Sequence, residues 1–314
     1  MSNAGRWPVR ELEARLGTGR IERDVPLAPY TTFRIGGPAD LLFRARSPEE
    51  LVGAAETAQE LNVPWFILGA GANILVADAG IRGLVIRNEA RAVEFMGEDR
   101  VAADSGVRVF PELIHATVAR GLGGLHHYVG IPSTVGGAIW QNLHFLSPDR
   151  DRTVFIEEVV ESCELLAPGG AVRTVGVEEL HFGYDYSVLH EGNDIALRAT
   201  FRLRREPEAA LREVIRNNLA WRNDRHPDLW LYPSAGSIFQ KIDGVGAGRV
   251  IEACGLKGHV HGRVQVFHRH ANIIVNLGGA TADEVRELID VVRARVLKER
   301  GLELVPEIGF IGEH

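Results

Sequence analysis

The architecture of this chain is constrained most by the segment Gly130-Ile131-Pro132-Ser133-Thr134-Val135-Gly136-Gly137-Ala138. A second stretch of the same character, Gly69-Ala70-Gly71-Ala72-Asn73, lies about sixty residues earlier. Short loops rich in Gly, Ser, Thr and Asn allow successive backbone N–H groups to converge on one point, and this geometry holds phosphate oxygens. Two such loops indicate one extended anionic ligand, such as a dinucleotide, held from two sides.

The first loop does not continue as a Rossmann nucleotide-binding motif, which requires a long amphipathic helix after the glycines. Here the apolar run Ile74-Leu75-Val76 follows, and then turn residues and a second run, Gly83-Leu84-Val85-Ile86. On its own, this loop is equally compatible with a tight turn between two strands. The second loop is harder to explain as a simple turn, because its nine residues include three Gly, one Pro, one Ser and one Thr.

The composition is that of a globular protein: of its 314 residues, 45% are hydrophobic and 25% are charged, enough for two or three domains. The net charge of −7 argues against binding to nucleic acid or to an anionic membrane, so any phosphate site is expected to be local. Two cysteines, Cys163 and Cys254, are too few for a disulfide scaffold. Neither a transmembrane run nor a signal peptide is evident, so we expect a cytoplasmic protein.

The order of helix and strand patterns predicts an α+β fold with a leader and three units. The leader is a helix in residues 1–21, and the three units are a first subdomain in 22–91, a second in 92–206 and a third domain in 207–314. We expect helices over residues 7–20, 48–61, 110–120, 207–226 and 281–301, and strands over 63–68, 101–103, 159–166, 196–203 and 273–276. The best-marked helix starts are Ser47 and Thr281, each with a glutamate three residues later.

Seven segments, in one order along the chain, are together distinctive: residues 31–40, 69–73, 83–86, 130–138, 233–239, 270–276 and 306–308. They resemble the UDP-N-acetylenolpyruvoylglucosamine reductase family, flavoenzymes that make UDP-N-acetylmuramate for peptidoglycan. The resemblance extends from about residue 22 to residue 312, nearly the whole chain. Seven motifs in order are far more specific than any one of them.

The resemblance implies two N-terminal subdomains that share one FAD, of the vanillyl-alcohol-oxidase type, and a C-terminal α+β domain for the substrate whose last segment returns to the active site. It also implies a ping-pong reaction, in which NADPH reduces the flavin and leaves before the enolpyruvyl double bond is reduced. The residues that it assigns to the cofactor are Gly69, Ala70, Gly71, Ala72, Asn73, Gly106, Gly130, Ile131, Pro132, Ser133, Thr134, Gly136 and Gly137.

We expect the FAD to be bound non-covalently, because the first glycine loop contains no histidine. We also expect a branched side chain at Gly71 to block the approach of the pyrophosphate. The implied partner is a small nucleotide-sugar substrate, with no nucleic acid and no membrane, and we expect a monomer or a weak dimer.

By the same resemblance, Ser237 matches the proton donor of the family and Glu307 matches a carboxyl group near the reacting carbons. Reduction of an enol ether conjugated to a carboxylate needs a hydride, stabilisation of the developing enolate and a proton for the other carbon. Without the motifs, the ordinary explanations are a turn serine and a surface carboxylate. The candidate substrate-binding residues are Tyr184, Asn142, Arg222, Arg225, Lys241, His270 and Asn272.

Three positions depart from the family pattern. Asp185 stands where an arginine pairs with the substrate carboxylate, and a carboxylate there repels an anionic substrate. A second departure is Asn142-Leu143-His144, which replaces the usual Asn-Ala-Gly. The third is Lys241, which follows Phe239 by one residue more than the family lysine does. We therefore expect Arg222, Arg225 or Lys241 to supply the cation that is missing at position 185.

Two other functions remain open at this stage. The chain is alternatively a flavin enzyme of the same scaffold with a different substrate, or a flavin-binding homologue with impaired catalysis. A metal site is not expected: the histidines cluster at 126–127, 259–261 and 268–270, but their spacing does not match a zinc site.

Overall fold

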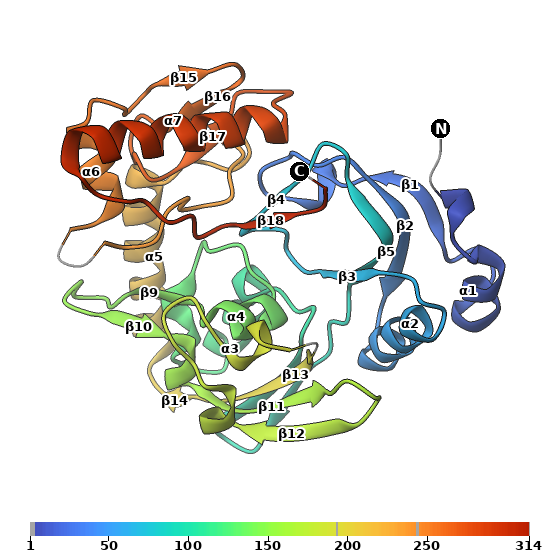
Figure 1. The fold of residues 1–314 in the computed structure, drawn as a ribbon. Helices are drawn as coiled ribbons and strands as arrows, with labels where there is room; N and C mark the ends of the chain where they lie inside the picture. The colour runs from blue at the N-terminus through green and yellow to red at the C-terminus, as the bar shows by residue number, and fades with distance from the viewer. Residues whose placement is uncertain (1–3, 193, 243–244, 314) are drawn as a thin grey trace.

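The first part of the chain builds a four-stranded sheet covered by two helices in the computed structural model, which describes residues 4–192, 194–242 and 245–313 (Figure 1). The strand order is β1-β2-β5-β3, in which β1 is antiparallel and the others are parallel. The elements are β1 (Glu22–Pro26), β2 (Pro38–Ala45), β3 (Trp65–Leu68), β5 (Ile81–Asn88), α1 (Val9–Leu16) and α2 (Pro48–Glu60). The predicted N-cap of α2 is confirmed, because the Ser47 hydroxyl accepts the Glu50 amide at 3.3 Å.

The second part is built on a five-stranded antiparallel sheet of order β12-β11-β13-β7-β6. Its strands are β6 (Val93–Met96), β7 (Arg100–Asp104), β11 (Val160–Leu166), β12 (Val172–Gly176) and β13 (Ile195–Arg202). Smaller pairs are β8 (Leu122–Gly123) with β14 (Arg204–Arg205) and β9 (His144–Leu146) with β10 (Thr153–Phe155). The helices are η3 (Val109–Leu113), a π-helical turn, which leads into α3 (Ile114–Val118), and α4 (Val135–Gln141).

The last part combines three helices with a small antiparallel sheet, β15-β16-β17. Its elements are α5 (Glu208–Arg225), α6 (Ala247–Ala253), α7 (Ala282–Arg300), β15 (Val260–His261), β16 (Val264–Val266) and β17 (Ile274–Asn276). The predicted capping box of α7 is present between Thr281 and Glu284, and Gly301 ends the helix in the left-handed conformation. Helix α5 buries Leu211 and Ile215 in the core of the five-stranded part, whereas α7 packs against α6 and β16.

Short 3-10 turns connect these elements. They are η1 (Ala4–Arg6), η2 (Ala28–Tyr30), η4 (Leu125–Tyr128), η5 (Ile156–Glu158), η6 (Val177–Leu180) and η7 (Val188–His190). In the part of the chain that is described, no helix is both long and apolar enough to span a bilayer.

The end of the chain crosses back to the first part of the molecule (Figure 1). Strand β18 (Gly309–Ile311) pairs in parallel with β4 (Ile74–Val76), which directly follows the first glycine loop. Phe33, Ile35 and Leu75 are buried in the same apolar cluster as α6 and α7. Backbone pairing and a shared core therefore attach the last part to the first.

A short ladder holds the segment that contains Ser237. The Ile238 amide donates to the Asn272 carbonyl at 2.8 Å, and the Ile238 carbonyl accepts the Glu307 amide at 2.7 Å. Ser237 is therefore placed one residue from a backbone that is bonded on both sides, and Glu307 lies on the neighbouring segment.

The Asn272 side chain closes this ladder. It is 7% exposed; its carboxamide oxygen accepts the Phe239 amide at 3.0 Å, and its nitrogen donates to the Phe239 carbonyl at 2.8 Å. Both polar groups of Phe239 are thus satisfied by one buried side chain.

We predict that Asn272→Ala lowers the free energy of unfolding by roughly 2–4 kcal/mol, because two buried backbone groups lose their partners. Asn272→Asp should also destabilise the protein, since a carboxylate accepts the Phe239 amide but cannot donate to the Phe239 carbonyl. Urea unfolding followed by circular dichroism measures both, with Asn223→Ala on the exposed side of α5 as the control. A wild-type midpoint for Asn272→Ala would refute the role of this clamp.

Candidate active site

The first glycine loop, residues 69–73, directs its carbonyl groups into the protein. They accept hydrogen bonds from the Arg87 side chain, from the Thr32 amide at 2.9 Å and from the Gly309 amide at 2.9 Å. Within residues 4–192, 194–242 and 245–313, no acceptor is found for the amide N–H groups of this loop. A short loop with satisfied carbonyls and unpaired amides has the donor arrangement that an anion requires.

The second glycine loop lies against the first. A Cβ atom added to Gly69 would be 2.8 Å from the Thr134 hydroxyl, so the two loops touch at this point. The Thr134 hydroxyl also accepts the Gly137 amide at 3.3 Å and caps α4, while the Gly136 amide donates to the Ser105 carbonyl at 2.8 Å. The predicted approach of two small-residue loops to one place is therefore seen in the structure.

Gly71 is constrained by the chain itself. Its φ is +61°, and an added Cβ would lie 2.4 Å from the Tyr30 carbonyl oxygen. Our expectation that a side chain here would meet the ligand is wrong in its geometry, because the Cβ direction is already filled by backbone. Gly106 is similar, with an added Cβ only 2.5 Å from the Ala90 carbonyl oxygen.

The ladder described above places Ser237 and Glu307 on adjacent segments of the backbone. Ser237 is partly exposed, and its hydroxyl forms no hydrogen bond within the described part of the chain. Burial raises the pKa of the Glu307 carboxyl to about 8; the Asp185 charge raises it further, and the Lys241 ammonium opposes the increase. At neutral pH, Glu307 is therefore mainly protonated.

The loop that carries Tyr184 and Asp185 adds the other polar groups. The Asp185 Oδ1 atom lies 3.5 Å from the His144 Nδ1 atom, and the His144 and Tyr184 rings are 4.9 Å apart. The Lys241 ammonium lies 5.2 Å from the centre of the Tyr184 ring. The structure thus gathers residues from β9, from the loop after η6 and from the segment after Ser237.

The three candidate cations are placed differently. Lys241 is exposed, and its ammonium lowers the pKa of both the Glu307 and the Asp185 carboxyl. Arg222 stacks over Phe145 at 5.3 Å, and burial lowers its pKa to about 10. Arg225 is exposed and pairs with the adjacent Asp224 at 2.8 Å. Of the three, Lys241 is the one whose charge affects the pKa of the two carboxyls.

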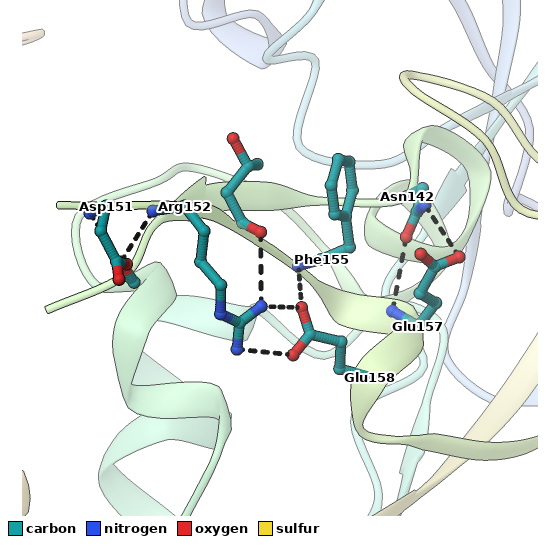
Figure 2. Close-up of polar contacts among 8 residues, drawn as sticks. Asn142, Asp151, Arg152, Phe155, Glu157 and Glu158 are labelled. Carbon is teal, nitrogen blue, oxygen red and sulfur yellow. Dashed lines mark hydrogen bonds and ion pairs between the residues drawn. The ribbon is translucent and has the colours of Figure 1, made fainter. Parts of the chain in front are cut away.

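Asn142 is buried, and its side chain forms a hydrogen bond with the loop that carries Tyr184. Its side-chain nitrogen donates to the Gly183 carbonyl at 2.9 Å. The same nitrogen donates to the Glu157 carboxylate at 3.3 Å, and the side-chain oxygen accepts the Glu157 amide at 3.4 Å (Figure 2). The next residue, Glu158, is held by Arg152 at 2.8 Å. Since only 1% of Asn142 is exposed, its role in the site is to hold the loop that carries Tyr184 in place through these hydrogen bonds.

His270, one of the candidate substrate-binding residues, packs against another histidine ring. His270 faces His226 with ring centres 5.2 Å apart, and burial lowers the pKa of both. Among the described residues, no group of three or more His, Cys, Asp or Glu side chains is arranged to hold a metal ion.

Three residues at the site were not anticipated in their present roles. Arg87 and Thr32 hold the carbonyls of the first loop, and His144 lies against Asp185. Thr32 belongs to one of the seven motifs, but the sequence has no local signal that connects it to a loop forty residues away. For His144, the sequence showed only that a larger side chain replaces the usual glycine.

Comparisons with known proteins agree with this geometry. Residues 39–176 match a model of the FAD binding domain, and residues 227–311 match a model of the UDP-N-acetylenolpyruvoylglucosamine reductase C-terminal domain. The reductase of that name from Rubrobacter xylanophilus is 42% identical over 293 residues, which cover 92% of this chain and 95% of the relative. The one from Moorella thermoacetica is 40% identical over 306 residues, covering 96% and 98%.

A solved structure gives the same result. The crystal structure of UDP-N-acetylenolpyruvylglucosamine reductase from Thermus caldophilus superimposes with a TM-score of 0.77 at 32% identity, covering 93% of this chain and 99% of that one. The resemblance inferred from the seven motifs is confirmed. The chain belongs to the UDP-N-acetylenolpyruvoylglucosamine reductase family and carries an FAD-binding domain ahead of the family's C-terminal domain.

Proposed function

We propose that this protein uses NADPH and FAD to reduce UDP-N-acetylenolpyruvoylglucosamine to UDP-N-acetylmuramate, a precursor of peptidoglycan. The observation that supports this proposal is the backbone ladder that sets the segment of Ser237 beside the segment of Glu307, where the Lys241 ammonium lowers the pKa of the Glu307 carboxyl. A proton donor, a hydrogen-bond donor for a carboxylate and a cation are the groups that reduction of a conjugated enol ether requires.

The two glycine loops fit a dinucleotide cofactor. Amides without acceptors in residues 69–73 and the neighbouring small residues of 130–137 would hold FAD non-covalently. When bound, FAD would supply the carrier that takes a hydride from NADPH and delivers it to the substrate.

Ser237 would complete the addition to the double bond. As one carbon receives the hydride, the Ser237 hydroxyl gives its proton to the other carbon, and the serine oxygen is reprotonated from water. The alkene thereby gains one hydride and one proton, and NADPH is the reductant. Partial exposure of Ser237 allows both contacts, and the bonded backbone on either side of Ile238 fixes its position.

Glu307 and Lys241 would act on the substrate carboxylate. Negative charge builds up there in the transition state, and groups that are already oriented stabilise it without reorganisation. A protonated Glu307 donates a hydrogen bond, whereas an ionised one would repel the same charge. Lys241 provides the positive charge, and Tyr184, below its ammonium, restricts where that charge lies.

Two alternatives remain within the same scaffold. Asp185 favours a flavin enzyme with a less anionic substrate, and a catalytically impaired homologue is the other. Anaerobic stopped-flow mixing of the wild type separates them: our proposal requires bleaching of the bound flavin by NADPH and its reoxidation by the enolpyruvyl sugar. Reduction without reoxidation would support a different substrate, and no reduction would support impaired catalysis.

We also propose that the protein acts in the cytoplasm as a monomer or weak dimer and that the domain boundaries lie near residues 21, 91 and 206.

Ser237→Ala should slow reoxidation of the reduced enzyme by the substrate by roughly 100-fold or more, the usual effect of a positioned acid. Reduction by NADPH should stay near the wild-type rate, since no proton from Ser237 is needed there. Stopped-flow absorbance of the flavin measures each half-reaction separately. Equal slowing of both would identify Ser237 as a structural residue.

Lys241→Met keeps most of the apolar stem and removes the charge. We expect kcat/KM for the substrate to fall by a factor equivalent to about 2–4 kcal/mol, comparable to losing one oxyanion donor. Lys257→Met is the matched control, because Lys257 pairs with Glu252 at 2.9 Å. Arg225→Met tests a rival candidate. Both should stay within about twofold of wild type, as expected for exposed ion pairs.

If Arg225→Met causes the large loss and Lys241→Met does not, our assignment of the cation is wrong.

A further inference from the structure

Arg87 is a buried cation near the end of β5, and it contacts the first glycine loop from the side of the protein core. Only 9% of Arg87 is exposed, and its guanidinium donates a hydrogen bond to the Gly69 carbonyl. The Arg87 Nε atom is buried and has no hydrogen-bond partner within the described residues. Buried polar atoms of this kind are uncommon in folded proteins, and each calls for an explanation.

The charge of Arg87 has no close counter-ion in the part of the chain that the structure describes. Glu89, two residues further along, pairs with Arg44 at 3.1 Å, and Arg44 also pairs with Glu22 at 2.8 Å. A charged group that is removed from water without an anionic partner lowers the stability of the fold. A buried guanidinium beside a loop of unpaired amides is therefore more easily explained by a ligand than by the fold.

Tyr30 fixes the place of this guanidinium. The Arg87 Cζ atom lies 5.7 Å from the centre of the Tyr30 ring, and the Tyr30 hydroxyl accepts a hydrogen bond from Arg44 at 2.6 Å. The backbone of the same tyrosine lies beside Gly71, since an added Cβ there would be 2.4 Å from the Tyr30 carbonyl oxygen. Tyr30 thus packs against both Arg87 and the loop that Arg87 holds.

The contact with Gly69 determines the direction of the next amide. In a planar trans peptide, the C=O and N–H bonds of one unit point in opposite directions. Because the Gly69 carbonyl points toward Arg87, the Ala70 N–H group points away from Arg87. This N–H group has no acceptor among the described residues. It is therefore directed out of the core and is available to a ligand.

A cation on the carbonyl also makes this amide a better donor. A hydrogen bond at one end of a peptide polarises the unit, and bonds in a chain strengthen one another in a site of low dielectric constant. The Gly71 carbonyl accepts only neutral donors, among them the Thr32 amide at 2.9 Å. Among the loop carbonyls with described partners, that of Gly69 is the one bonded to a charged group.

We propose that Arg87 is a positioning residue for the cofactor: its guanidinium holds and polarises the Gly69–Ala70 peptide, so that the Ala70 N–H group donates to a phosphate oxygen of FAD. The inference rests on the proposed function, which takes FAD to be the ligand of this loop. The negative charge of the pyrophosphate supplies the counter-charge that Arg87 lacks, and Arg87 acts through the peptide.

The test is the affinity of the apoprotein for flavins, measured by the fluorescence of the flavin ring. Arg87→Met removes the charge and its hydrogen bond but keeps an unbranched side chain. It should raise Kd for FAD by roughly 10-fold or more, the usual effect of losing a hydrogen bond to a charged group. Riboflavin has the same ring without a phosphate, and its Kd should stay near that of the wild type.

Two further variants make the result specific. Arg87→Lys keeps a cationic donor, so its loss of FAD affinity should be smaller than that of Arg87→Met. Arg91→Met is the matched control, because Arg91 is exposed and pairs with Glu112 at 3.3 Å; it should bind FAD as the wild type does. Circular dichroism checks that each apoprotein is folded. If Arg87→Met is not, the ratio of FAD to riboflavin affinity in Arg87→Lys decides.

Amide NMR of the apoprotein gives a readout without any ligand. The 15N signal of Ala70 should move in Arg87→Met, because the peptide is no longer polarised, and that of Ala72 should move less. An unchanged Kd for FAD, or equal losses for FAD and riboflavin as a merely structural role would give, would overturn the proposal. A wild type that binds no FAD would refute the proposed function too, whereas FAD binding that is equal in all variants would refute only the role of Arg87.

Discussion

The parallel pairing of β18 with β4 is the contact on which the site depends. The Gly309 amide binds the Asn73 carbonyl at 2.9 Å, next to the first glycine loop, and two residues earlier the Glu307 amide binds the Ile238 carbonyl at 2.7 Å. One short segment thus connects the first glycine loop, Glu307 and the segment that contains Ser237. A slip of one residue in this register would turn Glu307 to the opposite face.

Around this segment, buried asparagine side chains form the hydrogen bonds to the backbone that strands or helices provide elsewhere. Asn142 supports the loop before Asp185, Asn272 satisfies the backbone of Phe239, and Asn276 donates to the Phe33 carbonyl at 3.1 Å. All three are less than a tenth exposed. A buried polar group without a hydrogen-bond partner destabilises the folded state. These bonds therefore hold the irregular loops in one conformation. The loops can therefore hold catalytic groups without being part of a large sheet.

Features that depend on near neighbours in sequence were predictable. The caps at Ser47 and Thr281 and the helix end at Gly301 follow from local hydrogen bonding, and each is found where the pattern placed it. The family resemblance located the segments that carry Ser237 and Glu307. The replacement of an arginine by Asp185 was also visible in the sequence.

Features that depend on tertiary placement were not predictable. Arg222 and Arg225 are close to Ser237 in sequence, but α5 directs them toward Phe145 and Trp221. Lys241 reaches the carboxyls because the chain returns along the ladder. The role of Gly71 was also misjudged, since only the fold shows that Tyr30 fills the space beside it.

We propose that the substrate carboxylate is bound between Lys241 and a protonated Glu307, with Ser237 at the double bond. The most direct measurement is a crystal structure of FAD-loaded Ser237→Ala with UDP-N-acetylenolpyruvoylglucosamine. We predict a carboxylate oxygen within about 4 Å of the Lys241 ammonium and hydrogen-bonded to Glu307, the range in which such a pair matters. A carboxylate paired with Arg222 or Arg225 instead, with Lys241 turned to solvent, would contradict the claim.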